Sequence, residues 1–127
     1  MNAYATDSWK RAKEALIVAE RDLDVSPDAA ASRAYYAAFH AVSALFAFEG
    51  RTFTKHSALE TAVHRDLVKA GRWPPSLGAD FSSLRDVRDT GDYGGEEHVS
   101  SEEARDSIET ARRILLAVRQ AIPERET

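Results

Sequence analysis

Apolar residues recur along this chain in steps of three and four positions, the period of an amphipathic helix. The first such stretch runs from about Asp7 or Ser8 to Leu23, and its apolar face carries Trp9, Ala12, Leu16, Ala19 and Leu23. No stretch sustains the two-residue alternation of a strand, and β-branched residues are sparse. The pattern therefore predicts five helical segments and no strand.

The second segment has the strongest signals for its ends. Ser26 is a typical N-cap, Pro27 suits the first turn, and Gly50 follows as a natural stop. Between them the helix is apolar nearly all the way round, so neighbours must wrap it. Its aromatic and alanine residues offer more apolar surface than two neighbouring helices can cover. We therefore expect a second copy of the chain to pack there, giving a homodimer.

Three further helices follow. The third is expected from near Thr54 to Gly71, and the segment "RWPPSLG" is expected to be a loop because consecutive prolines interrupt the helical ladder. The fourth carries Phe81, Leu84 and Val87 and ends at Tyr93. The fifth opens with a capping box, Ser100 to Glu103, and stops before Pro123; the last four residues look like a frayed tail. Short connections predict an all-α, up-and-down antiparallel four-helix bundle with one additional short or terminal helix, as a single domain over residues 1–127.

Composition narrows the class of protein. The 127 residues contain no cysteine, so disulfides and thiolate metal sites are excluded. The first residues lack the apolar run of a signal peptide, and no apolar stretch reaches eighteen residues. We therefore expect a cytoplasmic protein without a membrane association.

Charge is distributed unevenly along the chain. The net charge is −4, which argues against a surface that coats nucleic acid. Residues 85–106 hold eight acidic residues and three arginines, so this segment is −5 and the remainder is +1. RNA could dock there only if basic groups from elsewhere, or from a second subunit, outweighed that field.

The four histidines raise the question of a metal site. Zinc ligands on a helix commonly lie at positions i and i+4, but His56 and His64 are eight residues apart and no pair has that spacing. We expect no metal and no other cofactor. The alternative interpretation makes His64 a surface residue and has His56 cap the start of the third helix.

A polar row lies on the second helix. Arg33, Tyr36 and His40 share one of its faces, and polar groups on an apolar helix need partners. In the structural interpretation, Arg33 pairs with an acid near the bundle end, while His40 bonds a backbone carbonyl or a tyrosine hydroxyl. In the functional interpretation, His40 faces the same cleft as Arg88.

A second polar group closes the fourth helix. Arg88 and Asp92 are an i, i+4 pair, Arg85 lies one turn earlier, and Tyr93 stands beside them. Local rules favour a simple ion pair. They leave unexplained the tyrosine followed by two glycines, which could bring the backbone close to a ligand.

Three blocks of the sequence, in this order, resemble the HEPN superfamily: "SRAYYAAFHAVSALF", "KHSAL" and "RDTGDYG". The similarity covers roughly residues 8–120. It implies a small all-α bundle, often a homodimer. Many members are metal-independent endoribonucleases, often toxins paired with a small nucleotidyltransferase antitoxin.

The resemblance also implies a site near Arg88. The family signature is an Arg followed four to six residues later by His, in which the His transfers a proton and the Arg stabilises charge on the phosphorane. Here Asp92 and Tyr93 follow Arg88, and the next His, His98, lies beyond the glycines. Asp is a poor acid at neutral pH, so His40 or His56 would have to supply the proton transfer. Arg33 and His40 match the spacing by accident, because they lie on the second helix.

Three functions remain open. The first is a toxin-type or defence-associated protein that binds RNA or a nucleotide and has weak, altered or partner-dependent endoribonuclease activity. In it Arg88, Asp92, Tyr93 and His40 are catalytic, and substrate contacts come from Arg85, Arg33, Tyr36 and His56. The second is a non-catalytic nucleotide- or protein-binding module that acts with a nucleotidyltransferase partner, which adenylylates Tyr93. The third is a dimeric scaffold in which the Arg88–Asp92 pair only holds the fourth helix.

Overall fold

A computed structural model describes residues 2–123. The helices are α1 (Ala3–Asp22), α2 (Pro27–Phe48), α3 (His56–Ala62), α4 (Pro75–Tyr93) and α5 (Ser101–Ala121). A π-helical turn, η1 (Val63–Val68), continues α3 without a break. No strand occurs within residues 2–123. The predicted all-α class with five helical segments is confirmed.

Side-chain caps fix several helix ends. The Ser26 hydroxyl accepts from the Ala29 amide, and Ser100 and Glu103 form the predicted capping box. The first helix begins at Ala3, four or five residues earlier than predicted, because the Asn2 side chain accepts from the Ala5 amide at 2.8 Å and caps it. The tail that the sequence suggested, residues 124–127, lies outside the described residues.

The double proline begins a helix instead of extending a loop. Pro74 occupies the N-cap position of α4 and Pro75 its first turn, where the missing amide hydrogen costs nothing. The prediction that the whole of "RWPPSLG" is a loop was therefore wrong. The third helix also starts later than predicted, at His56, and its second half has π-helical hydrogen bonding, which no local sequence signal announced.

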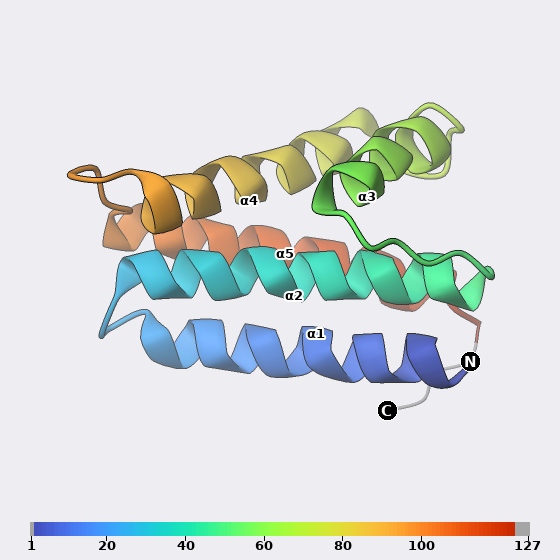
Figure 1. Ribbon diagram of the computed structural model, residues 1–127, viewed down its shortest axis with the longest axis horizontal. Coiled ribbons are helices and arrows are strands. Elements are labelled where there is room, and N and C mark those ends of the chain that lie inside the picture. Colours follow the sequence, from blue (N-terminus) through green and yellow to red (C-terminus); the bar gives the residue numbers. More distant parts are fainter. Residues whose placement is uncertain (1, 124–127) are drawn as a thin grey trace.

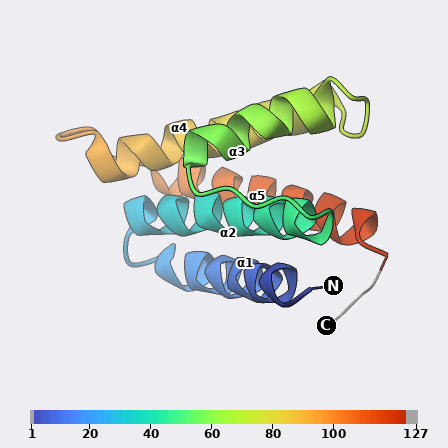
Figure 2. The same ribbon diagram turned by 45° about the vertical axis from the view of Figure 1, so that its right-hand side comes forward.

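The four long helices form an up-and-down bundle (Figure 1). Helix α2 lies in the middle, antiparallel to α1 and α4 and parallel to α5, and it contacts all three. Helix α3 is the additional short element and lies beside α4 in both views (Figure 2). The loop that follows α2 runs back over α2 before α3 begins.

Helix α2 supplies the centre of the core. Tyr35, Leu45 and Phe46 are almost fully buried, and its alanines pack against alanines of α1, so that the two helices approach closely. The large exposed apolar residues within 2–123 all lie outside α2: Tyr4, Ile17, Val18, Val25, Tyr93 and Leu116. The expected excess of uncovered apolar surface on α2 is therefore not found, because three long helices cover most of it and leave only a half-buried strip. The dimer itself stays a prediction. Within residues 2–123 no helix is both long and apolar enough to cross a membrane.

Candidate functional site

One face of α2 remains partly accessible. Arg33 is exposed, and Tyr36, Phe39 and His40 are half-buried, whereas their neighbours Tyr35, Ala37 and Ala38 are buried. We call Arg33, Tyr36, Phe39 and His40 the open face of α2. The motif residues of α4 and His56 of α3 approach this face from one side.

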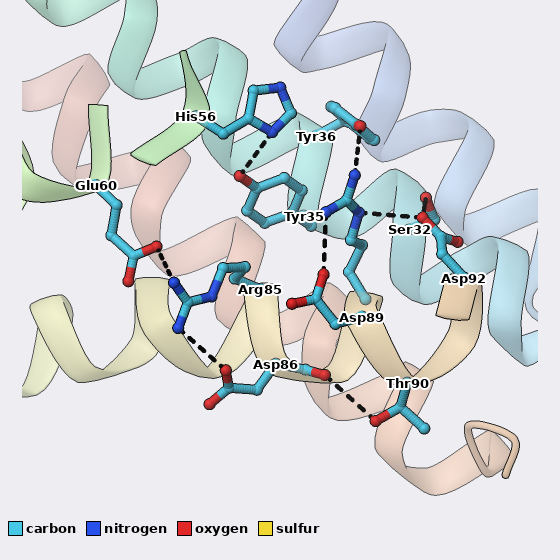
Figure 3. A network of polar contacts seen from close by, with 11 residues as sticks. Ser32, Tyr35, Tyr36, His56, Glu60, Arg85, Asp86, Asp89, Thr90 and Asp92 are labelled. Atoms are coloured by element: carbon cyan, nitrogen blue, oxygen red, sulfur yellow. Dashed lines mark hydrogen bonds and ion pairs between the residues drawn. The ribbon is translucent and has the colours of Figure 1, made fainter. Parts of the chain in front are cut away.

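The Arg88 guanidinium crosses from α4 to α2 instead of lying along its own helix. One Nη donates to the Tyr36 hydroxyl at 2.9 Å and the other to Asp89 Oδ1 at 3.0 Å (Figure 3). Nε lies 3.0 Å from Asp92 Oδ2, which makes the predicted i, i+4 ion pair, although the N–H is not aligned for a hydrogen bond. Only 13% of the Arg88 side chain is exposed. The guanidinium is therefore held on three sides.

Aromatic rings surround the same guanidinium. Its central carbon lies 5.2 Å from the ring centre of Tyr35 and 5.4 Å from those of Tyr36 and Tyr93. Such cation–π contacts are strongest where water is excluded. The charge faces the interior as the functional hypothesis requires, but two carboxylates already compensate it. A phosphate would have to displace Asp89 or Asp92 to reach it.

Arg85 turns away from this cluster. It pairs with Glu60 of α3 at 2.7 Å and with Asp86 at 3.3 Å. Glu60 also accepts from Ser82, whose hydroxyl lies 2.9 Å from His64 Nε2. These contacts join α3 and η1 to α4. The His64 side chain is 43% exposed, in keeping with the predicted surface histidine, although its ring also contacts Ser82. Arg85 stabilises this join and does not share the contacts of Arg88.

His56 is the histidine associated with Arg88. Lys55, not His56, occupies the N-cap of α3, and no side chain caps that end, so the predicted capping role was wrong. Instead Nδ1 of His56 lies 3.3 Å from the Tyr35 hydroxyl, and its ring centre lies 4.4 Å from that of Phe39. Burial, and secondarily the charge of Arg88, lowers the pKa of His56 below its usual 6.5. Burial raises the pKa of Tyr35 to about 12, so its hydroxyl stays protonated.

His40 packs against the same two aromatic residues as His56. Its ring centre is 5.5 Å from that of Phe39 and 6.2 Å from that of Tyr36, and Arg88 is not among the charges that act on its pKa. Burial lowers the pKa of His40, and the charges of Arg11 and Arg33 lower it further. Within residues 2–123 His40 has no hydrogen bond and Arg33 no ion pair; Arg33 stacks 5.1 Å over Tyr36. Both structural pairings predicted for this row were therefore wrong.

Tyr93 is the exposed member of the motif. Its side chain ends α4 and is 73% exposed, with one ring face toward Arg88. The two glycines serve the helix end rather than a ligand. A Cβ on Gly94 would stand 2.4 Å from the Thr90 carbonyl oxygen, and Gly95 has a φ of +64°. The following loop is fastened to α2, where Asp28 accepts from the Val99 amide and contacts His98, each at 2.7 Å.

Sequence reasoning missed several members of this arrangement. Asp89, adjacent to Arg88, was an available signal as a competing carboxylate. Tyr35 and Glu60 were hidden because only the fold brings them to His56 and Arg85. Arg11 of α1 gave no signal either, since it is one cation among many on an exposed face. Within residues 2–123 no three His, Asp or Glu residues are grouped as metal ligands would be.

The fold and the site define a small helical bundle whose fourth helix ends in an inward Arg, a carboxylate and an outward Tyr. The sequence model of the HEPN domain family matches residues 5–121, and the chain belongs to this family. It is 37% identical over 95 residues to a protein of Thermotoga maritima described as "UPF0332 protein", covering 75% of this chain and 72% of that protein.

A solved structure supports the fold. The chain resembles the crystal structure of TT1696 from Thermus thermophilus with a TM-score of 0.78, over 93% of this chain and 98% of that chain. The two sequences are 22% identical, so this likeness concerns the fold alone.

Proposed function

We propose that this HEPN domain is a non-catalytic module that acts with a nucleotidyltransferase partner, and that Tyr93 is the residue this partner modifies. One observation carries the proposal: the motif tyrosine is 73% exposed at the end of α4, while the motif arginine is enclosed. A modifying enzyme must reach the hydroxyl of its target. The family resemblance adds that such partners can adenylylate a tyrosine in this motif.

The chemistry is a nucleotidyl transfer. The Tyr93 oxygen attacks the α-phosphorus of a nucleoside triphosphate bound to the partner, a base of the partner takes the phenolic proton, and pyrophosphate leaves. The new phosphodiester carries one negative charge. The Arg88 guanidinium carbon lies 5.4 Å from the centre of the Tyr93 ring, so Arg88 is the nearby cation, for which the new phosphate competes with Asp89 and Asp92. No group of this chain is required as an acid or base.

The test is co-expression with a nucleotidyltransferase encoded beside the gene for this chain. Intact-mass measurement should find one or more nucleotidyl groups added, and peptide mapping should place them on Tyr93. Tyr93→Phe should abolish the addition. Tyr4→Phe is the matched control. Tyr4 is 52% exposed but is not the expected target, so this variant should receive the nucleotidyl group as the unaltered protein does. Addition that persists in Tyr93→Phe, or none on the unaltered protein, refutes the proposal.

A second candidate function is weak endoribonuclease activity of a toxin or defence protein. The observation that favours it is His56, whose lowered pKa leaves a neutral imidazole near Arg88 at pH 7, able to accept the proton of a 2′-hydroxyl. Asp89 and Asp92 work against it, because they occupy Arg88 and repel a polyanion.

This second candidate is tested with labelled single-stranded RNA and a chelator. Slow cleavage by the unaltered protein should disappear in His56→Gln and in Arg88→Ala, with circular dichroism confirming that both variants are folded. Cleavage that persists in both variants comes from a contaminant. Absence of cleavage removes this candidate and leaves the first untouched.

A further inference from the structure

Two adjoining concavities lie along the α1 side of the open face of α2. The first, of about 280 Å³, is lined by Tyr4, Asp7, Ser8, Arg11, Phe39, His40, Ser43 and Phe53. The second, of about 260 Å³, is lined by Arg11, Glu14, Ala15, Val18, Arg33 and His40. Because Arg11 and His40 line both, the two spaces are neighbours. Neither contains Arg88 or Tyr93, so they lie apart from the motif site.

The first concavity suits a flat ring. Tyr4, Phe39 and Phe53 contribute three aromatic side chains to its wall, and aromatic pairs favour stacked and edge-to-face contacts with a planar ligand. The hydroxyls of Ser8 and Ser43 are hydrogen-bonding groups in the same wall. Such a wall can stack on a heteroaromatic ring and hydrogen-bond to its edge.

The second concavity suits an anion. Arg11, Arg33 and His40 all line it, with Glu14 as the one carboxylate in this wall. Within residues 2–123 Arg33 has no carboxylate partner, and Arg11 has only Asp7, at 2.7 Å and largely in solvent. In contrast to Arg88, these guanidinium groups can turn to a phosphate without breaking an enclosed network.

We propose that the two concavities form one binding site for a phosphate monoester that carries a heteroaromatic ring, with the ring among Tyr4, Phe39 and Phe53 and the phosphate at Arg11, Arg33 and His40. This site is independent of the proposed modification of Tyr93. The ligand is a mononucleotide-like molecule, because it has to place a ring in the first concavity and a phosphate in the second.

His40 reports on occupation of the site. The charged and titratable groups that face it are Asp7, Arg11 and Glu14 from α1, Arg33 from its own helix and His56 from α3. In the free protein burial and the two arginines lower its pKa, and Asp7 opposes them. A phosphate bound beside the His40 imidazole favours the charged form of that imidazole. Binding therefore raises the pKa of His40 and takes up protons near neutral pH.

The experiment is a titration of the full chain with adenosine 5′-monophosphate, inorganic phosphate and adenosine, followed by the NMR signals of the histidine rings. Adenosine 5′-monophosphate should shift the His40 signals in a saturable way and raise its pKa. Inorganic phosphate should do so only at about tenfold or higher concentration, since it lacks the ring, and adenosine should leave the His40 pKa unchanged. Equal affinity for the nucleotide and for inorganic phosphate overturns the proposal.

Variants locate the two halves of the site. Arg33→Ala should weaken nucleotide binding by about tenfold or more, the loss expected for one charge-assisted hydrogen bond. Arg105→Ala, an exposed arginine of α5, is the matched control and should change nothing. Tyr4→Ala should weaken the nucleotide but leave binding of inorganic phosphate as it was. If Arg33→Ala and Arg105→Ala weaken binding equally, the effect is one of net charge and the proposal fails.

Discussion

Two ion pairs with the same residue types and spacing allow a direct comparison of enclosed and exposed charge. Arg88 and Asp92 on α4, and Asp7 and Arg11 on α1, are both i, i+4 pairs. In the α1 pair the two side chains are 63% and 60% exposed, whereas those of Arg88 and Asp92 are 13% and 29% exposed. We predict that Arg88→Met costs several times more stability than Arg11→Met.

The magnitude follows from the contacts that each substitution removes. Arg88→Met loses a charge-assisted hydrogen bond to Tyr36, of about 1.5–2 kcal/mol in a half-buried setting. Contact with the three tyrosine rings adds about 1 kcal/mol. The pairs with Asp89 and Asp92 add about 0.5 kcal/mol together, because solvent screens both carboxylates. The substitution also removes the buried Nε, which lacks a hydrogen bond, and leaves an apolar side chain in its place, and this offsets about 1 kcal/mol of the loss. The net loss is about 2 kcal/mol, whereas the exposed Arg11 pair, which solvent screens, should contribute only a small fraction of that.

The assay is urea unfolding of both variants and of Asp92→Asn. Equal m-values with different midpoints indicate that stability alone has changed. Asp92→Asn should cost no more than about 1 kcal/mol, because its carboxylate is near the C-terminal end of α4, where the helix dipole disfavours it. In the double variant Arg88→Met/Asp92→Asn, the two losses should be less than additive, because an unpaired carboxylate is removed with the arginine.

The reasoning is refuted if Arg88→Met and Arg11→Met differ by less than about 0.5 kcal/mol, the scatter of ordinary surface substitutions. It is also refuted if Asp92→Asn costs as much as Arg88→Met. That result would mean that the contacts of Asp92, which are the ion pair within α4 and the 3.4 Å hydrogen bond from Ser32 of α2, stabilise the protein as much as the contacts of Arg88 with Tyr36 and the rings. The scaffold hypothesis predicts this second outcome.

Two further predictions concern the join of α3 with α4 and the buried imidazoles. A Cβ at Gly78 would stand 2.7 Å from Val68 Cγ2 and 3.2 Å from His64 Nδ1. Gly78→Ala should therefore lower the free energy of unfolding, measured with urea, by about 1 kcal/mol after the gain in helix propensity, whereas Ser83→Ala at an exposed position should change it by less than about 0.5 kcal/mol. A more stable Gly78→Ala contradicts the close packing of α4 on the π-helical turn. The pKa values of His40 and His56 in the folded protein lie below the usual 6.5, so these two imidazoles bind protons more readily in the unfolded chain. The free energy of unfolding should therefore fall as the pH decreases from above 6.5 through the folded pKa values. Urea midpoints at pH 7.5 and 5.5 should show this loss, and His40→Gln/His56→Gln should reduce it; an unchanged pH dependence in the double variant assigns the loss to other groups.

The helices were predictable where a local signal coincides with the hydrophobic period. Ser26 with Pro27, and Ser100 with Glu103, mark the starts of α2 and α5 because the caps use only neighbouring residues. The π-helical turn after Ala62 has no such signal. It accompanies the approach of α4, whose Gly78 leaves room for Val68, and this contact joins residues that the sequence does not relate.

The candidate site was predictable in its residues and less so in its geometry. The residue types of Arg88, Asp92 and Tyr93 and their spacing place all three at the end of one helix. Which of them faces inward depends on the rotation of α4 against α2, which is set by packing of Phe81 and Leu84 in the core. The fold also decides which candidate proton carrier is near Arg88: the charge of Arg88 lowers the pKa of His56, whereas it is not among the charges that act on His40.

Tyr36 divides two electrostatic environments, and this division determines where an anion can bind. Its ring has the Arg88 guanidinium at 5.4 Å and that of Arg33 at 5.1 Å. On the Arg88 side the acidic segment supplies Asp89 and Asp92, so the cation is already neutralised. On the Arg33 side Arg11 adds a second cation, and the carboxylates of Asp7 and Glu14 do not contact Arg33 within residues 2–123. An anionic ligand therefore gains more from the α1 side, unless modification of Tyr93 brings a phosphate to Arg88 covalently.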